Sequence, residues 1–349
     1  MRRRILHIAM NRVRHLPGGM GFFSYLGNTV SSYHARRKRK ATLPHPKTLM
    51  IEVTNHCQLH CITCAREYAL GKQMDKGHLD LHLAKKLIDE NHVYLDRICL
   101  TGLGEPFVYP NLAEIIDYVH SRNKGIAIMI STNAQHPDTA RVLASIADKI
   151  ATLQVSIDGC GDVFEEIRVN ADYDVFLKRL EPLAEMMEKH HFDVKANMVV
   201  FNKNYRQMAD VVSVTKSMGF SELSLTPINL AASDWDLSHY DLYRTDDFRS
   251  ELEKAMLLAE REDISITYYD VTGAKGFRTC PYPWDNFYVT WDGFLVPCCA
   301  KPFPKEKHFG NVFEEGLMNC INSSGFVAFR QLANENVTPE FCRRCHLVT

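Results

Sequence analysis

Residues 48–64 read Thr-Leu-Met-Ile-Glu-Val-Thr-Asn-His-Cys-Gln-Leu-His-Cys-Ile-Thr-Cys, a short apolar segment followed by three cysteines. The apolar part, residues 48–54, has the length and composition of a buried strand. Cys57, Cys61 and Cys64 place three thiols directly after it. In parallel β/α folds, functional residues lie in the loops that follow the carboxyl ends of strands. The stretch therefore predicts a first strand with a metal-binding loop at its end.

Beyond this stretch, short apolar segments alternate with segments whose apolar residues recur at helical spacing. The expected strands are residues 48–54, 97–101, 125–130, 152–157, 194–201 and 222–226. The expected helices are residues 81–90, 111–120, 139–149, 173–190, 205–218 and 248–262. This alternation predicts β/α units around a parallel sheet. Six units predict an α/β fold, a partial (β/α)6 TIM barrel, because a closed barrel needs eight.

The pattern changes after residue 263, where a further candidate strand, residues 264–269, ends the alternation. Residues 287–291 and 294–297 flank Asp292-Gly293, a dipeptide that favours a β-hairpin turn. Six of the eleven cysteines lie in this last quarter of the chain. We therefore expect three parts: a basic N-terminal extension at 1–47, the partial barrel at 48–269, and a small C-terminal α+β domain at 270–349.

The first 40 residues carry ten Lys or Arg and no Asp or Glu, whereas residues 41–349 hold 31 basic and 42 acidic residues. A basic arm on an acidic body is typical of a solvated leader or of a segment that seeks anions. We expect a solvated or flexible leader. As an alternative, its arginines with Leu6, Ile8 and Phe22 could form a weak interfacial helix. The arm is therefore a candidate for contact with an anionic surface.

Hydrophobic residues make up 46% and charged residues 24% of the chain, which excludes a mainly disordered or fibrous protein. No run approaches the roughly 20 apolar residues of a membrane span. The longest candidate, residues 19–30, is broken by Gly21, Gly27 and Asn28. The arm also lacks the apolar core and cleavage site of a secretory signal. We therefore expect no integral membrane segment and a cytoplasmic location, where thiols stay reduced.

Eleven cysteines in a reducing compartment predict metal ligation before disulfides. Cys57, Cys61 and Cys64 can hold a four-iron cluster and leave one iron without a protein ligand. A catalytic metal site needs such an open position. The alternative is a structural zinc ion, for which His56 or His60 would be the fourth ligand.

The Cys-x3-Cys-x2-Cys spacing after a first strand resembles the radical S-adenosylmethionine (SAM) superfamily, and the resemblance covers most of residues 48–345. It implies a [4Fe-4S] cluster whose open iron binds the amino and carboxylate groups of SAM. Reductive cleavage of SAM would give a 5′-deoxyadenosyl radical that abstracts a substrate hydrogen. The chain departs from the family at Thr63, where many members carry an apolar residue that packs near the adenine.

A second motif supports the resemblance. Residues 101–106, Thr-Gly-Leu-Gly-Glu-Pro, resemble the segment that holds the methionyl amine of SAM. The resemblance implies that Gly102 and Gly104 let the backbone approach closely and that Glu105 supplies the negative charge.

Further candidates follow the later strands. The resemblance places Ser131 and Asn133 at the ribose of SAM and Ser156 at its carboxylate or ribose. Arg168 would pair with a carboxylate of SAM or substrate, and its alternative role is a structural salt bridge. Thr226 ends the sixth expected strand and is a further candidate for the site.

The last quarter of the chain carries a second set of cysteines. Cys280 and Cys298 flank the expected hairpin, which would fold them together, and Cys342 and Cys345 form a Cys-x2-Cys pair. Together they would complete a four-thiolate site. Spacing alone leaves open whether it holds an iron–sulfur cluster or a zinc ion.

The sequence around these cysteines resembles the twitch/SPASM extension of radical SAM enzymes. The matching segments are Cys280-Pro-Tyr-Pro-Trp284, Trp291-Asp-Gly293, Pro297-Cys298 and Gly310-Asn-Val312. A full SPASM domain has seven cysteines, and its Cys-x2-Cys-x5-Cys-x3-Cys run is missing here. The four cysteines fit the shorter twitch form, which implies one auxiliary [4Fe-4S] cluster. We expect Cys99, Cys299 and Cys320 to be structural, with the Cys299 side chain pointing away from the cluster.

The resemblance implies an enzyme, with three reactions open. The first is oxidation of an alcohol of a sugar- or cyclitol-like small molecule, with the auxiliary cluster as electron acceptor. The second is epimerisation, with Cys160 facing the barrel mouth as hydrogen donor. The third is modification of a ribosomal peptide. Each needs a reducing partner such as flavodoxin or ferredoxin. A non-enzymatic protein that binds nucleic acid or membranes is the alternative suggested by the basic arm.

Overall fold

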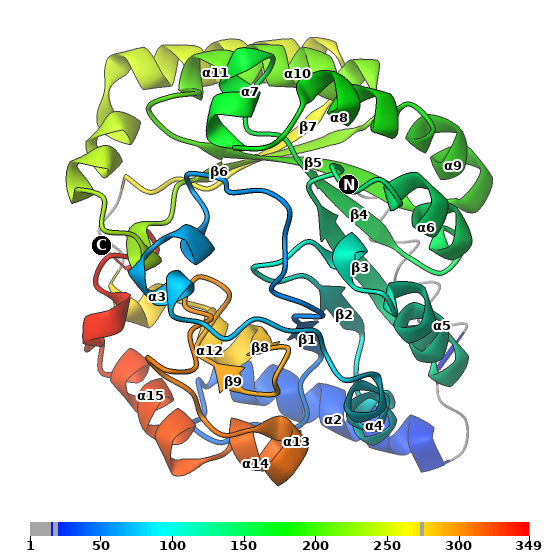
Figure 1. Cartoon of the computed structure of the whole chain (residues 1–349). Helices are drawn as coiled ribbons and strands as arrows, with labels where there is room; N and C mark the ends of the chain where they lie inside the picture. The colour runs from blue at the N-terminus through cyan, green and yellow to red at the C-terminus, as the bar shows by residue number, and fades with distance from the viewer. Residues whose placement is uncertain (1–14, 17–19, 273–275, 349) are drawn as a thin grey trace.

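A curved sheet of parallel strands organises the molecule (Figure 1). The computed structural model describes residues 15–16, 20–272 and 276–348. In these ranges nine strands form one sheet, in the order β7-β6-β5-β4-β3-β2-β1-β8-β9. The strands are β1 Thr48–Ile51, β2 Arg97–Leu100, β3 Ala127–Thr132, β4 Thr152–Ser156, β5 Asp193–Val200, β6 Glu222–Pro227, β7 Ser265–Tyr268, β8 Phe287–Val289 and β9 Leu295–Val296. The sheet does not close, which confirms the partial barrel.

Helices follow the barrel strands and cover the outer side of the sheet (Figure 1). They are α4 Leu81–Asn91, α5 Leu112–Arg122, α6 Thr139–Ile146, α7 Asp162–Ile167, α8 Tyr173–Leu180, α9 Leu183–His190, α10 Met208–Ser217 and α11 Asp246–Arg261. Helix α3 Ala69–Lys72 follows the first cysteine loop and lies apart from this outer layer (Figure 1). Short 3-10 helices are η1 Ala65–Glu67, η2 Pro106–Val108, η3 Tyr205–Gln207, η4 Leu230–Ala232, η5 Leu237–Arg244, η6 Phe277–Thr279 and η7 Glu340–Cys342. The single helix expected at 173–190 is wrong, because Pro182 separates α8 from α9.

The two faces of the barrel strands differ in burial. In β5, buried residues alternate with half-buried ones along the whole strand. Val194, Ala196 and Met198 belong to the core shared with the helices, and Asn197 lies on the opposite face. The face that is turned away from the helices is thus polar and only partly covered, as a ligand-binding interior requires.

The C-terminal part continues the barrel sheet. β8 and β9 form the expected hairpin, with Gly293 at a positive φ of 93° in its turn. β8 also pairs in parallel with β1, so that Leu49 lies opposite Phe287. Four further helices complete this part: α12 Tyr282–Asp285, α13 Val312–Glu315, α14 Leu317–Ile321 and α15 Ser324–Asn334.

The expectation of a solvated leader is wrong for residues 20–37, which form the helix α2 Met20–Arg37. The Tyr25 hydroxyl donates to Asp96 at 2.9 Å, directly before β2, and Asn28 donates to the His45 carbonyl at 3.0 Å. Helix α2 therefore packs across the amino ends of β1 and β2. Residues 1–14, with five of the arginines, lie outside the described residues. None of the described helices combines the length and apolar character that a membrane span requires.

Candidate active site

The first cysteine loop leaves the carboxyl end of β1, as expected. Burial raises the pKa of the Cys61 thiol to about 12, and the neighbouring Cys64 and Cys57 thiols raise it further. Burial likewise raises the pKa values of Cys57 and Cys64. Three buried sulfur donors thus lie close enough to act on one another. Because metal binding deprotonates thiols, this donor set fits an iron–sulfur cluster.

Two arginines lie beside this loop. Arg66 is buried and donates to the carbonyls of Cys57 and Leu59. Arg168 is also buried and forms a 2.8 Å ion pair with Asp158. Positive charge from Arg168 lowers the pKa of Cys61, which favours its thiolate form.

The alternative role expected for Arg168, a structural salt bridge, is therefore present. The ion pair with Asp158 involves only part of the guanidinium group. The Nε atom of Arg168 is buried without a hydrogen-bond partner among the described residues, and so is Oε1 of Gln58 in the cysteine loop. Unpartnered buried polar atoms of this kind fit a polar ligand.

The loop after β2 packs directly on the cysteine loop. A Cβ atom at Gly104 would lie 2.3 Å from the Thr54 carbonyl oxygen and 2.6 Å from that of His56. The Glu105 amide donates to the same His56 carbonyl at 2.9 Å. At Gly102, a Cβ atom would collide with the Glu52 side chain. Gly104 therefore lets the loop after β2 lie close to the cysteine loop, and Gly102 lets it lie close to Glu52.

The Glu105 carboxylate is buried and already bonded to the protein. It accepts hydrogen bonds from the Thr132 hydroxyl at 2.8 Å, the Asn133 amide at 2.7 Å and the Phe107 amide at 3.2 Å. Burial raises the pKa of Glu105 to about 7. The carboxylate thus ties the loop after β2 to the end of β3. The sequence analysis did not include Thr132 among the candidate residues. Because side chains alternate along a strand, Thr132 points to the opposite face from Ser131, and there its hydroxyl reaches Glu105.

Asn133 connects this carboxylate to the cysteine loop. Its side-chain amide donates to the Cys57 sulfur at 3.4 Å and accepts from Gln58 at 3.0 Å. Gln58 is a further contact that the sequence did not indicate. The structure therefore brings Glu105, Asn133 and Cys57 into one connected group.

The remaining polar candidates lie on the inner face of the sheet. Ser131 and Ser156 are half-buried on β3 and β4. Ser156 lies opposite Asn197 of β5, and the Thr226 hydroxyl donates to Asn197 at 3.0 Å. These side chains make a polar surface at the carboxyl ends of four adjacent strands.

Cys160 does not face the barrel mouth as expected. Burial raises the pKa of its thiol, Tyr173 of α8 lowers it, and the charge of Asp210 on α10 raises it. Both helices belong to the outer layer. The structure thus turns this thiol toward the helices rather than toward the polar interior.

The second cysteine set also converges. Burial raises the pKa of Cys342 to about 12, and Cys345 and Cys280 raise it further. Burial raises the pKa of Cys298 well above its ordinary value, with contributions from Cys280, Cys342 and Cys345. The four thiols from three separate segments are thus close enough to act on one another. Such a set suits a cluster with one thiolate per iron.

Polar neighbours surround this second set. Asn229, which follows β6, donates to the Cys345 sulfur at 3.4 Å and so links the set to the barrel. Lys301 is buried, lies 3.0 Å from Glu306 and lowers the pKa of Cys342. A buried cation beside thiols favours their ionised, metal-binding form.

Cys299 lies closer to this set than expected. Its sulfur is 3.3 Å from the Tyr282 hydroxyl, and its charge raises the pKa of Cys298. Cys99 and Cys320 are buried, as expected of structural cysteines. Within the described ranges, no three His, Cys, Asp or Glu side chains could hold a single metal ion as they stand.

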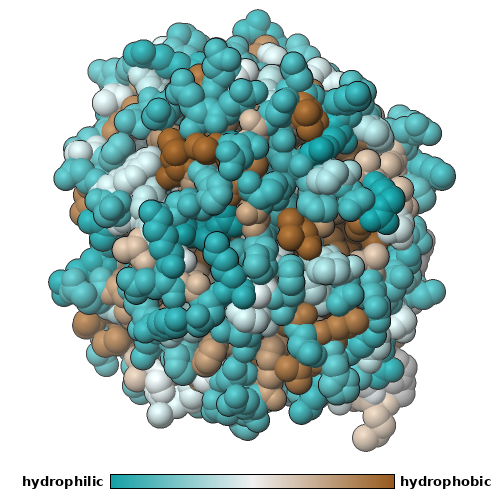
Figure 2. Space-filling view, viewed as in Figure 1, coloured by the Kyte–Doolittle hydropathy of each residue, from teal (hydrophilic) through white to brown (hydrophobic). Residues whose placement is uncertain are grey.

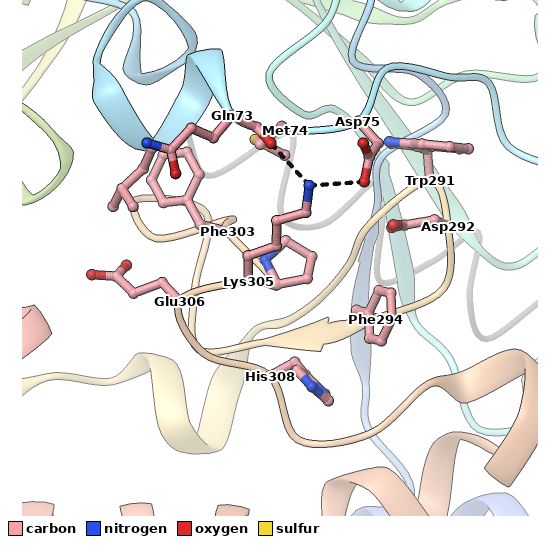
Figure 3. Close-up of a pocket in the computed structure, with 12 residues that line it drawn as sticks. Gln73, Met74, Asp75, Trp291, Asp292, Phe294, Phe303, Lys305, Glu306 and His308 are labelled. Atoms are coloured by element: carbon pink, nitrogen blue, oxygen red, sulfur yellow. Dashed lines mark hydrogen bonds and ion pairs between the residues drawn. The ribbon is translucent and has the colours of Figure 1, made fainter.

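A pocket of about 300 Å³ lies between α3 with the segment after it and the turn of the β8–β9 hairpin with the loop after β9 (Figure 3). Lys305 reaches across it to the Gln73 carbonyl and the Asp75 carboxylate, each at 3.0 Å. Its aromatic walls are Trp291, Phe294 and Phe303. The pocket thus marks a contact between the segment that follows the first cysteine loop and the segment that follows Cys298.

Comparison with known proteins agrees with this arrangement. A model of the radical SAM superfamily matches residues 51–214, and a model of the SPASM iron–sulfur cluster-binding domain matches residues 280–346. The first match contains the Cys57–Cys64 loop and Glu105. The second runs from Cys280 past Cys345. The protein belongs to the radical SAM superfamily.

Two curated relatives match most of this radical SAM chain. The antilisterial bacteriocin subtilosin biosynthesis protein AlbA of Bacillus subtilis is 26% identical over 310 residues, which cover 85% of this chain and 64% of AlbA. The chain thus spans less than two thirds of AlbA. The tungsten-containing aldehyde ferredoxin oxidoreductase cofactor-modifying protein of Pyrococcus furiosus is 25% identical over 334 residues, 86% of this chain and 87% of that protein.

The fold also resembles solved structures. Streptococcus suis SuiB bound to S-adenosylmethionine superposes with a TM-score of 0.68 over 90% of this chain and 74% of SuiB. At 17% sequence identity this likeness concerns the fold.

The radical SAM and SPASM domains settle which cofactors the enzyme uses. A radical SAM domain implies SAM and a [4Fe-4S] cluster, and a SPASM domain implies auxiliary iron–sulfur chemistry. The three clustered thiols beside unpartnered polar atoms fit the first cluster with its ligand. The four thiols of the C-terminal part fit one auxiliary [4Fe-4S] cluster.

Proposed function

We propose that this radical SAM enzyme oxidises an alcohol carbon of a sugar- or cyclitol-like small molecule, and that its auxiliary cluster accepts the electron. When bound, SAM and the first cluster supply a 5′-deoxyadenosyl radical that takes one hydrogen atom from the substrate. The resulting carbon radical must then lose one electron and its hydroxyl proton to become a carbonyl. The enzyme must therefore provide an acceptor for this electron.

The observation that carries this proposal is the convergence of Cys280, Cys298, Cys342 and Cys345. Four thiols can ligate every iron of a cluster, which leaves no iron free to bind substrate. A closed cluster suits electron transfer. The buried Lys301 beside Cys342 supports the same role, because nearby charge and hydrogen bonds tune the potential of a cluster.

At the first site, we propose that Cys57, Cys61 and Cys64 hold the catalytic cluster. Gly104 keeps the loop after β2 close to them, and Gly102 keeps it close to Glu52. Because Glu105 already accepts three hydrogen bonds, its role is to orient that loop and to offer its remaining lone pairs to the methionyl ammonium.

The polar interior supplies the remaining contacts of this proposal. Ser131, Asn133 and Ser156 would bind the ribose and carboxylate of SAM, and the free Nε of Arg168 would face a carboxylate. Thr226, with Asn197, would contact hydroxyl groups of the substrate. The half-buried polar face that they share supports a hydroxylated substrate.

A second candidate function is modification of a peptide. AlbA is named for bacteriocin biosynthesis, and SuiB has been solved bound to its precursor peptide SuiA. The Pyrococcus furiosus relative is named as a cofactor-modifying protein, which supports the small-molecule substrate proposed first. Epimerisation has less support, because the Cys160 thiol lies beside Tyr173 among the outer helices. In each case a flavodoxin or ferredoxin would deliver the first electron.

Cluster content is the first test. We expect about eight irons per chain, four for each of two clusters. Replacing Cys57, Cys61 and Cys64 by alanine should remove about four and abolish 5′-deoxyadenosine formation. Replacing Cys342 and Cys345 should also remove about four, yet leave SAM cleavage. Cleavage of SAM by the first variant would contradict the assignment of the catalytic cluster.

The fate of the substrate separates the candidate reactions. Polyhydroxylated small molecules and short peptides are each incubated with enzyme, SAM and reductant in deuterated water. We expect a hydroxylated compound to stimulate 5′-deoxyadenosine formation and to gain a carbonyl, with Cys160→Ala as active as the native enzyme. Stimulation by peptides alone would favour the second candidate. Solvent deuterium at the abstracted carbon, lost in Cys160→Ala, would favour epimerisation.

A further inference from the structure

Helix α2 packs against the protein with one face. Tyr25, Asn28 and Ala35 are buried there, and Tyr25 lies under the Lys47 ammonium group, 3.7 Å from its ring centroid. Arg36 adds a 2.9 Å ion pair to Asp285 of the C-terminal part. These contacts fix the rotation of the helix about its axis and decide which residues face outward.

The outward face of α2 is apolar. Phe23 is 73% exposed, Leu26 41%, Val30 57% and Tyr33 60%. Their spacing of three, four and three residues places them within about 80° of the helix surface at about 100° per residue. This stripe lies opposite the buried face. By contrast, hydrophilic side chains dominate the face of the molecule in Figure 2, where hydrophobic ones form small separate patches.

The charge around this stripe has one sign. The first 40 residues hold ten Lys or Arg and no Asp or Glu, and Arg36, Arg37 and Lys38 lie where α2 ends. Arg37 donates to the hydroxyl of Tyr33, so a basic side chain lies on the stripe itself. Asp285 neutralises Arg36, and the remaining basic residues leave an excess of positive charge at this end of the helix. An apolar stripe next to excess positive charge is typical of a helix that lies in a membrane interface.

We propose that the outward face of α2 docks on the surface of an anionic lipid bilayer. Phe23, Leu26, Val30 and Tyr33 insert between headgroups, and the basic residues lie against lipid phosphates. A nucleic acid would neutralise the basic residues but leave the apolar stripe of α2 exposed to water. A second copy of the chain would cover the stripe but bring two basic arms together. The bilayer alone satisfies both features.

Docking in this way leaves the chemistry accessible. Helix α2 crosses the amino ends of β1 and β2, whereas the first cysteine loop and the polar interior lie toward the carboxyl ends of the strands. The enzyme would therefore sit on the bilayer with its interior open away from it. This proposal is independent of the substrate proposed above.

Vesicle sedimentation tests the proposal with the full-length, cluster-loaded protein. Vesicles of phosphatidylcholine alone are compared with vesicles that contain equal parts of phosphatidylglycerol, at about 0.1 M and about 0.5 M salt. We expect binding to the anionic vesicles only, weakened by salt. The F23S/V30S variant should bind about tenfold more weakly or worse. Its matched control is M256S/L257S, which removes two exposed apolar side chains of α11 and should bind like the native protein.

Unchanged 5′-deoxyadenosine formation shows that each variant is folded. Equal binding by the native protein and F23S/V30S would overturn the proposal, as would an equal loss in the control. Two further results would assign the face to another occupant and so also overturn it. One is a lipid-free dimer that F23S/V30S loses in sedimentation velocity. The other is duplex DNA binding that F23S/V30S weakens as strongly as it weakens vesicle binding.

Discussion

Glu52 is a fully buried carboxyl group that joins two loops through hydrogen bonds. Its Oε1 atom accepts from the Leu103 amide at 2.9 Å and from the Tyr288 hydroxyl at 3.0 Å. The Trp291 amide donates to Oε2 at 3.4 Å. The loop that carries Glu105 and the turn after β8 thus share one carboxylate. Burial raises the pKa of Glu52 from 4.5 to about 7.

We predict that Glu52→Gln changes the pH dependence of stability. Between pH 4.5 and 7 the unfolded chain releases this proton while the folded chain keeps it, so native stability falls as pH rises. Glutamine cannot ionise and avoids this fall. The stability of the variant relative to the native protein should therefore rise by roughly 3 kcal/mol across this window. Urea unfolding at several pH values measures it.

The exposed Glu188→Gln variant is the control for Glu52. Its stability should follow that of the native protein at each pH. If the Glu52→Gln curve also runs parallel to the native curve, Glu52 titrates alike in the folded and unfolded chains, and the proposed linkage is wrong.

At the scale of elements, the site depends on one loop resting on another. The backbone after β2 approaches the cysteine loop so closely that a methyl group at Gly104 would meet the carbonyl oxygens of Thr54 and His56. Carbonyl groups of a packed backbone cannot rotate away as a flexible side chain can. One added carbon therefore has to displace the loop that carries Cys57.

We predict that Gly104→Ala loses about four irons and SAM cleavage while it keeps the auxiliary cluster. The matched control is Gly27→Ala in α2, where a Cβ atom meets nothing within 4 Å. Alanine there should raise stability by about 0.5–1 kcal/mol, because glycine is unfavourable inside a helix. Iron analysis and urea unfolding compare the two. Full iron content in Gly104→Ala would show that the cysteine loop can move to accommodate the methyl group, and it would contradict the prediction.

At the scale of the whole molecule, Arg330 of α15 connects segments that are far apart in the sequence. The side chain is fully buried and stacks on the Phe326 ring at 4.0 Å. It donates to the carbonyls of Pro283, Ala41 and Ile321 at 2.8 to 2.9 Å. The segment that leads into the barrel and the C-terminal helices are thus joined through one guanidinium.

We predict that Arg330→Met lowers the free energy of unfolding by about 3–5 kcal/mol, because three buried carbonyls lose their donor. The control is Arg249→Met, since the exposed Arg249 forms an ion pair with Asp246 three residues away. Its loss should cost at most about 0.5 kcal/mol. Urea unfolding measures both. Similar losses in the two variants would mean that these carbonyls find water instead.

Local patterns predicted the parts of this protein that depend on neighbouring residues. The period of apolar residues gave the strands and most helices, and Asp292-Gly293 predicted the hairpin that β8 and β9 form. Cysteine spacing predicted two groups of thiols, and each group converges. The strands, the helices, the hairpin and the Cys57–Cys64 loop need only the chain within about a dozen residues of each point. The C-terminal thiols span residues 280–345, and their grouping rested on the resemblance to a known domain.

Contacts between distant segments were decided by the tertiary structure alone. Pairing of β8 with β1 extends the barrel sheet into the C-terminal part, and the sequence of neither strand indicates the other as its partner. Helix α2 contains two glycines and turns its apolar stripe outward, so its place on the protein depends on the contacts of Tyr25 and Asn28. The Cys160 thiol lies near Tyr173 and Asp210 of the outer helices, which are distant from it in the sequence. Burial free energy is summed over the whole molecule, and a local stretch of sequence does not contain that sum.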